Sequence, residues 1–193
     1  LVEYDDYQFP RLFPNRNLFS FQNGVYNLSD NEFMPYGDPM LTPDIVTCKY
    51  FDAYFDVDAY IAAGSWTNFP TPHFEGIFTY QQIPPEVIIW VYVMIGRMFY
   101  SVGQHDDWQV SLFLKGQAGT GKSTLLNIIK SFFQDMDVGT LSNNIEKKFG
   151  LEGLYDKFVV ICYEVKSNFQ LEQSDLQSMI SGVTPSSMKL RIC

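Results

Sequence analysis

Hydrophobic and polar residues recur along this chain with two periods, which together predict a mixed α/β protein. Short β-prone runs predict strands at residues 19–28, 32–36, 45–50, 110–115, 138–141 and 158–164. Longer runs with apolar residues at helical spacing predict helices at residues 52–63, 84–102, 123–133 and 170–180, with a brief one at 145–149. The first two strands flank turn-rich residues and predict a β-hairpin, while Asn23-Gly24 allows a bend or bulge inside the first of them.

Two irregular stretches divide this pattern. Residues 1–20 contain prolines and have no clear period, which is typical of an extended lead-in. Residues 64–72 contain a tryptophan and two prolines and predict an irregular connection. We therefore expect a small mixed α+β segment with a hairpin and a linker over residues 1–80, and an α/β domain over residues 81–193.

The predicted helix at residues 84–102 is apolar around nearly its whole circumference, so we expect it to be buried against other elements. Pro84-Pro85-Glu86 is a favourable helix start, because proline is tolerated in a first turn and glutamate favours the positive end. Arg97 interrupts the apolar surface, and we expect its side chain to be ion-paired or to extend to solvent.

Residues 116–123, with the sequence GQAGTGKS, fit the pattern G-x-x-x-x-G-K-[ST]. This pattern is a strong signature of a phosphate-binding loop when it lies between a strand and a helix, as it does between residues 110–115 and 123–133. Gly-rich turns also join strands to helices in proteins that bind no nucleotide. The complete octet in this context favours a nucleotide-phosphate site.

The chemistry of phosphate binding explains why these residue types occur in this loop. Glycines let successive N–H groups turn inward around phosphate oxygens, and the following helix adds the positive end of its dipole. Lys122 would reach the β and γ phosphates, and the Ser123 hydroxyl would be a ligand of a bridging Mg²⁺. Thr124 is a candidate for an α-phosphate contact. The predicted residues that bind ATP are Gly116, Gln117, Ala118, Gly119, Thr120, Gly121, Lys122, Ser123 and Thr124.

A second candidate for chemistry is Glu164, which ends the predicted strand at residues 158–164. A run of five β-prone apolar residues is typical of a buried parallel strand, and ligands in such sheets bind at the carboxyl ends of strands. An acidic residue that merely ends a strand is the alternative. Because a phosphate loop requires a partner carboxylate, we predict that Glu164 orients the attacking water and, with Ser123, holds Mg²⁺.

Composition and charge narrow the range of functions. The 193 residues are 46% hydrophobic and 17% aromatic, which is typical of a globular protein with a packed core. The net charge of −9 means that any nucleic-acid contact must come from a local basic patch. Three widely spaced cysteines lack metal-ligand spacing and favour an intracellular location, and no run is long enough for a membrane span or typical of a signal peptide.

The last residues carry two basic side chains, Lys189 and Arg191, which would lie on one face of a strand. They are candidates for a hairpin that contacts nucleic acid. A solvated basic end is the equally open alternative.

Several of these motifs together resemble the superfamily 3 helicases. The matching stretches are residues 116–123, 144–157, 163–166 and 171–182. More narrowly, they resemble the primase–helicase replication proteins of large nucleocytoplasmic DNA viruses, which are related to the poxvirus uncoating-factor ATPase. Residues 21–28 and 33–36 resemble the segment that precedes the helicase domain in that family.

The resemblance implies an AAA+-like P-loop ATPase core in residues 81–193, preceded by a pre-helicase segment in residues 1–80. It further implies a homo-hexameric ring that uses ATP and Mg²⁺ to move along single-stranded DNA at a replication fork, inside the host cell at the site of viral DNA replication. By match to the family's motifs, residues 116–123 are the Walker A loop, Lys122 and Glu164 are catalytic, and Glu164 is the Walker B carboxylate. Lys189 or Arg191 would fall on the hairpin that contacts DNA.

This sequence departs from the family in two ways. Tyr163 occupies the first of two positions that are usually acidic, and the polar sensor and arginine finger would lie beyond Cys193. Arginine fingers contribute factors of about 10³–10⁵ to the rate of phosphoryl transfer. We therefore expect an incomplete ATPase domain that binds ATP but hydrolyses it poorly alone. The alternatives are a P-loop kinase, which would need a lid with mobile arginines, and an ATP-binding assembly subunit without turnover.

Overall fold

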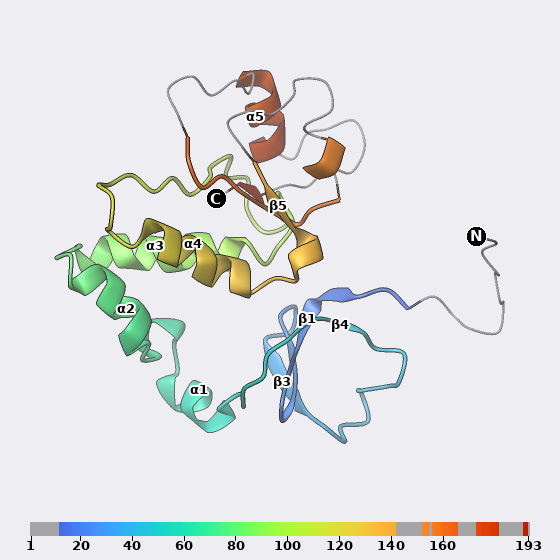
Figure 1. Cartoon of the computed structure of the whole chain (residues 1–193). Helices are drawn as coiled ribbons and strands as arrows, with labels where there is room; N and C mark the ends of the chain where they lie inside the picture. Colours follow the sequence, from blue (N-terminus) through green and yellow to red (C-terminus); the bar gives the residue numbers. More distant parts are fainter. Residues whose placement is uncertain (1–11, 142–151, 155, 166–172, 182–190, 193) are drawn as a thin grey trace. The chain divides into compact units, whose positions relative to one another are not determined.

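A computed structural model describes residues 12–141, 152–154, 156–165, 173–181 and 191–192. The chain forms two compact units, Leu1–Trp66 and Thr67–Cys193, and it is a mixed α/β protein, as the sequence predicts (Figure 1). The predicted boundary at residue 80 falls just after α2 (Pro72–Thr79), which belongs to the second unit. The predicted helix at residues 145–149 lies outside the described residues.

The first unit contains a four-stranded mixed sheet in the order β3-β2-β1-β4. β1 pairs antiparallel with β2 and parallel with β4, and β2 pairs antiparallel with β3. The strands are β1 (Asn15–Phe21), β2 (Gly24–Asn27), β3 (Glu32–Pro35) and β4 (Thr47–Tyr50).

The predicted hairpin is present as β2 and β3, but a second turn precedes it. Residues 19–28 do not form one strand, because Gln22 and Asn23 turn the chain between β1 and β2. Gly24 is needed at this turn, since a Cβ there would lie 2.3 Å from the carbonyl oxygen of Met34. The bend that Asn23-Gly24 allowed is therefore the turn of a second hairpin.

Phe55 occupies the middle of an aromatic cluster in the first unit. Its ring centroid lies 5.0 Å from that of Phe33, 5.1 Å from Phe21 and 5.2 Å from Tyr26. The short helix α1 (Val57–Ala63) follows directly. It begins later than predicted because the Asp56 carboxylate accepts a hydrogen bond from Ala59 N at 2.9 Å and caps the helix there.

The second unit combines a small parallel sheet with helices. The sheet has the order β5-β6-β7, with both pairs parallel. Its strands are β5 (Val138–Thr140), β6 (Val159–Ile161) and β7 (Arg191–Ile192), and the helices besides α2 are α3 (Pro85–Arg97), α4 (Lys122–Ser131) and α5 (Gln173–Ser181). Single 3₁₀ turns occupy Trp66–Asn68, Asp135–Asp137 and Glu152–Leu154.

One hydrophobic core joins β6 to α2, α3 and α4. Every residue of β6 has 0% exposure, which confirms the buried strand predicted there, although it ends at Ile161 and not at residue 164. α3 faces this core on one side only, because Val87, Ile89 and Trp90 are 45–55% exposed, so the expectation that it is buried around nearly its whole circumference is wrong. α4 faces the core with another apolar stripe. The buried members from these helices and from the residues just after α3 and α4 are Phe78, Ile88, Val91, Ile95, Met98, Leu125, Leu126, Ile129 and Phe133.

The prediction of a strand at residues 110–115 is wrong, because this run is not a strand in the structure. Leu112 and Leu114 pack against the core while Phe113 is 68% exposed, so the inside–outside alternation of a strand is present. No backbone pairing of this run with another described segment was found. A strand requires a hydrogen-bonded partner, and hydrophobic alternation alone does not supply one.

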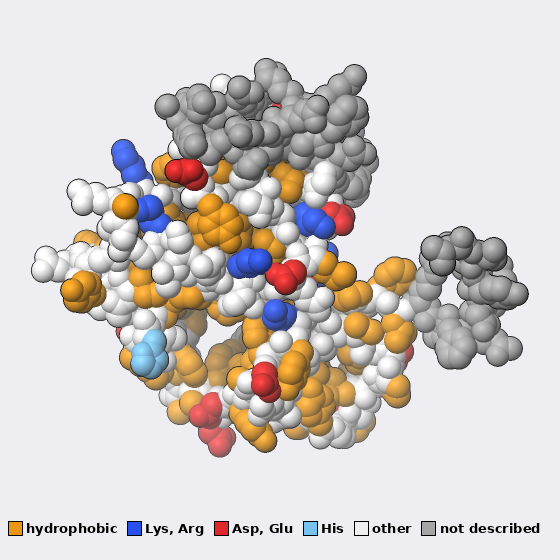
Figure 2. Space-filling model, viewed as in Figure 1, with side chains coloured by type: hydrophobic (Ala, Val, Ile, Leu, Met, Phe, Trp, Pro, Cys, Tyr) orange, Lys and Arg blue, Asp and Glu red, His pale blue; other side chains and the backbone are white. Residues whose placement is uncertain are grey.

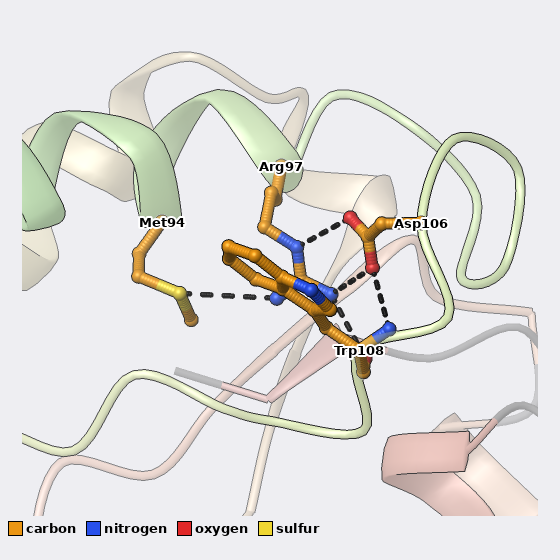
Figure 3. A network of polar contacts seen from close by, with 4 residues as sticks. All are labelled: Met94, Arg97, Asp106 and Trp108. Atoms are coloured by element: carbon orange, nitrogen blue, oxygen red, sulfur yellow. Dashed lines mark hydrogen bonds and ion pairs between the residues drawn. The ribbon is translucent and has the colours of Figure 1, made fainter.

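Arg97, at the last residue of α3, is ion-paired, which confirms one of its two predicted states. Its Nε and Nη2 each donate to the Asp106 carboxylate at 2.7 Å, and Nη2 also donates to Trp108 O at 2.9 Å (Figure 3). Its guanidinium lies over the Trp108 ring at 5.4 Å. These contacts tie the residues that lead toward the phosphate loop to the end of α3.

Within the described ranges, no helix has both the length and the apolar character needed to cross a membrane.

Candidate phosphate-binding site

The predicted phosphate loop leads into α4 through two left-handed glycines. Gly119 and Gly121 each have a φ of 79°, in a region that residues with side chains rarely adopt. Gly121 is the N-cap of α4, and its carbonyl oxygen accepts a hydrogen bond from Leu125 N at 2.9 Å. The glycines at these two positions of the octet therefore allow the turn that starts the helix.

The first turn of α4 is polar and exposed, whereas the apolar face of the helix is buried in the core. Leu125, Leu126 and Ile129 are at most 5% exposed and pack in the core with α3 and β6. Ser123 and Thr124 are exposed. Backbone N–H groups in the first turn of a helix lack acceptors within the helix and are available to an anion.

The Lys122 ammonium is held over the loop by the loop's own oxygens. Nζ donates to Gly116 O at 2.9 Å and to Gln117 O at 2.5 Å, and it lies 3.3 Å from Thr120 Oγ1. Thr120 Oγ1 itself donates to Gln117 O at 2.8 Å. These contacts place the cation beside the exposed loop backbone.

α2, which the sequence reasoning missed, contacts this loop. A Cβ on Gly121 would lie 3.4 Å from Ile77 Cγ2, so the α2 side chain is close to the start of α4. Two signals could have found this helix: Pro72 at its first position and Glu75 in its first turn.

Glu164 lies three residues beyond the end of β6 and is exposed. It therefore stands in the connection that follows the carboxyl end of a parallel strand, and not in the strand itself. The Cys162 thiol donates to its carbonyl oxygen at a sulfur–oxygen distance of 3.5 Å. Burial raises the pKa of this thiol, an effect that the hydrogen bond to Glu164 partly offsets.

Tyr163 links the end of β6 to the helix that carries Ser123. Its hydroxyl lies 3.4 Å from Asn127 Oδ1, a long hydrogen bond. Asn127 is four residues after Ser123 and so lies one turn along the same face of α4. The segment that bears Glu164 is therefore close to this face. The sequence reasoning did not consider Asn127, although its spacing from Ser123 could have indicated it.

The predicted metal ligands, Ser123 and Glu164, supply oxygen donors of kinds that Mg²⁺ binds. The described residues contain no group of three His, Cys, Asp or Glu side chains that could hold a metal by themselves. Mg²⁺ usually keeps several waters and takes one or two protein ligands besides substrate phosphates. A serine hydroxyl with one carboxylate, Ser123 and Glu164, is consistent with such a site.

The side chains of the two predicted nucleic-acid contacts lie outside the described part of the structure. Lys189 lies outside the described residues, and only the backbone of Arg191, in β7, is described. Among the described side chains on the face shown in Figure 2, those of Lys and Arg lie scattered between acidic and apolar ones and form no continuous basic stripe.

A separate pocket of about 370 Å³ opens at the end of α3. Its lining contains none of the predicted site residues, and two of its charged members, Arg97 and Asp106, satisfy each other. The full lining is Val93, Gly96, Arg97, Tyr100, His105 and Asp106.

Part of the second unit is similar to a protein family of unknown function. No curated protein matches the chain. A protein family of unknown function, DUF5906, matches residues 114–190, a range that contains the phosphate loop, β5, β6 and α5. The similarity to this family therefore lies in the second unit and includes Lys122, Ser123 and Glu164.

Proposed function

We propose that the chain binds ATP with Mg²⁺ at residues 116–123 and hydrolyses it as the motor domain of a superfamily 3 DNA helicase in viral DNA replication. One observation supports the proposal that the chain binds a nucleotide. The Lys122 ammonium is held by Gly116 O and Gln117 O, and Lys122 starts a helix that directly follows the left-handed glycines Gly119 and Gly121. A fixed cation beside exposed N–H groups is complementary to a phosphate chain.

In this proposal Lys122 and Ser123 have one task each, and Glu164 has two. Lys122 Nζ binds oxygens of the β and γ phosphates, and Ser123 Oγ and Glu164 hold the metal directly or through waters. Mg²⁺, when bound, neutralises charge that develops on the phosphates. The Glu164 carboxylate accepts a proton from the water that attacks the γ phosphorus, and the bond to the departing ADP oxygen breaks.

The helicase part of the proposal is supported by the resemblance of residues 116–123, 144–157, 163–166 and 171–182. Charge is unequal between the units, and the second is the less acidic of the two. The first has ten acidic and three basic side chains, whereas the second has twelve and ten. The proposed partners are single-stranded DNA or a replication fork and further copies in a homo-hexamer, at a viral replication site in the host cell.

One observation favours a second candidate, an ATP-binding assembly subunit without turnover. Tyr163, and not a carboxylate, precedes Glu164, and its hydroxyl lies 3.4 Å from an Asn127 side-chain oxygen. A single carboxylate would then have to support the metal and position water.

The direct test is equilibrium binding of a fluorescent ATP analogue with Mg²⁺. Lys122→Ala should weaken binding about 10- to 100-fold, because hydrogen bonds to charged groups contribute about 1.5–3 kcal/mol. Lys130→Ala is the matched control. It removes the same charge at the other end of α4, where Lys130 makes only an exposed ion pair with Asp135 at 3.1 Å.

Failure of the unaltered chain to bind, or equal binding by Lys122→Ala, would contradict the phosphate site. Turnover is measured in the same samples with and without single-stranded DNA. DNA-stimulated hydrolysis that Lys122→Ala abolishes supports the helicase. Tight binding without turnover at any DNA concentration supports the assembly subunit.

A further inference from the structure

The Lys122 ammonium has three acceptors within reach in the loop, so a phosphate oxygen that binds it takes the place of one of them. A lysine ammonium has three donors and no acceptor. Gly116 O and Gln117 O lie within 2.9 Å, and Thr120 Oγ1 is the third and longest contact at 3.3 Å. The loop therefore fixes the direction of the cation as well as its position.

Thr120 is the only one of these three partners that acts through its side chain. Its hydroxyl donates to Gln117 O at 2.8 Å and also accepts from Lys122, so it braces one of the carbonyls that holds the lysine. The hydroxyl lies over Gly116, where an added Cβ would approach it to 3.1 Å. Glycine at position 116 thus leaves the space that the Thr120 hydroxyl occupies.

We propose that Thr120 is a positioning residue, whose hydroxyl holds the Lys122 ammonium and the Gln117 carbonyl in the geometry that receives the nucleotide phosphates. This inference rests on the proposed function and assigns a role that the octet pattern leaves open, since that pattern accepts any residue at this position. Groups that are ordered before binding lose less entropy when the ligand arrives.

A role in loop stability alone is the competing explanation, and the two make different predictions. If Thr120 acts through Lys122, its effect depends on the phosphates that the lysine reaches and disappears when the lysine is absent. If Thr120 only stabilises the loop, its removal weakens binding of every nucleotide and does so equally without Lys122.

The test compares Thr120→Val, which keeps the shape but removes the hydroxyl, with Thr120→Ser, which keeps the hydroxyl. Affinities for ATP, ADP and AMP are measured with Mg²⁺ by competition against a fluorescent ATP analogue, up to millimolar concentrations. Thr120→Val should weaken ATP and ADP about tenfold, the effect of one lost hydrogen bond to a charged group, and leave AMP unchanged. Thr120→Ser should restore most of the affinity.

A double-mutant cycle supplies the second readout. In a Lys122→Ala background, Thr120→Val should have little further effect on ATP affinity, because the two side chains act as one unit. Thr140→Val is the control, since it makes the same change on an exposed residue of β5. Circular dichroism and thermal unfolding of each variant verify that it is folded.

Equal ATP affinity of Thr120→Val and the unaltered chain would overturn the inference, as would a loss that includes AMP or persists undiminished without Lys122. A gain in affinity would also overturn it, because the hydroxyl would then compete with phosphate. These failures are distinct from failure of the proposed function, in which the unaltered chain does not bind ATP or does not depend on Lys122.

Discussion

Tyr163 and Glu164 are adjacent residues just after β6, and only Glu164 carries a carboxylate. Both are exposed and follow the buried strand, and Tyr163 is in contact with α4 through Asn127. Mg²⁺ binds carboxylate oxygens in proteins, and a tyrosine side chain carries no carboxylate. Glu164 is therefore the candidate on which both metal binding and proton transfer depend in the proposed reaction.

Replacing the Glu164 carboxylate by its amide separates the effect on ATP binding from the effect on ATP hydrolysis. Glu164→Gln should leave the affinity for ATP within about threefold of the original, because the phosphate loop is unchanged. It should lower hydrolysis at least about 100-fold, the scale of a positioned general base. Steady-state phosphate release and nucleotide binding are measured on the same preparation.

Asp175→Gln is a suitable companion, since it replaces an acidic side chain in the first turn of α5 by an amide. Turnover by Glu164→Gln at the rate of the unaltered chain would dismiss Glu164 as the catalytic carboxylate. Loss of turnover in both variants would point to a general effect of charge.

At the scale of elements, the end of α3 depends on one ion pair. The Arg97 and Asp106 side chains are 15% and 27% exposed, and the guanidinium also contacts the Trp108 carbonyl and ring. Because these groups are largely removed from water, the pair is more costly to break than a surface salt bridge. It connects the end of α3 to the start of the run that leads into the phosphate loop.

Arg97→Ala should lower the free energy of unfolding by roughly 2 kcal/mol, because it leaves the half-buried Asp106 carboxylate without its partner. Arg97→Lys should recover only part of this, since an ammonium cannot form two parallel hydrogen bonds to a carboxylate. Urea unfolding followed by circular dichroism gives both values. A change below about 0.5 kcal/mol for Arg97→Ala would show that the pair behaves as an exposed one.

Elements with a strong local signal could be predicted from the sequence. α3 has prolines at its start and an apolar surface, and β6 is an apolar run whose residues are all buried. The boundaries of α1 and β6 were less accurate, because side-chain caps and pairing partners set them. The run at residues 110–115 shows the limit: its alternation is correct, but strand formation depends on a partner that the local sequence does not specify.

The parts of the candidate site that the octet motif determines could be predicted from the sequence. Contacts that depend on loop conformation or on packing with other elements could not. The octet indicated the two left-handed glycines and the lysine at the start of α4. It did not indicate that Thr120 braces Lys122, or that Ile77 of α2 lies against Gly121. The first depends on loop conformation, and the second on the packing of a helix that the sequence reasoning did not find.

At the scale of the whole chain, several raised pKa values in the second unit determine how it responds to alkali. Burial raises the pKa of Tyr100 and, as the largest cause, those of Tyr92 and Cys162, from ordinary values of 10.0, 10.0 and 9.0. The unfolded chain therefore releases these protons at lower pH than the folded chain. Stability contributed by these groups is complete below about pH 9 and is lost as the pH rises through the folded-state values.

We expect the unfolding temperature to fall steadily between about pH 9 and pH 11. Tyr100→Phe should make this fall shallower, because a phenyl ring has no proton to lose. Tyr80→Phe is the control, since Tyr80 is 92% exposed. The measurement is thermal unfolding by calorimetry across this pH range. An unfolding temperature that is constant or rises would show that burial of these groups does not control alkaline stability.

The tryptophan at the end of the Arg97 network also gives the protein an optical signature. The Trp90 and Trp108 ring centroids are 5.7 Å apart at an interplanar angle of 42°, and the third tryptophan, Trp66, belongs to the first unit. Indole rings this close interact electronically, and a cation beside one of them shifts its emission. In a Trp66→Phe chain, fluorescence excited selectively at tryptophan would therefore report on the second unit alone, without any attached dye.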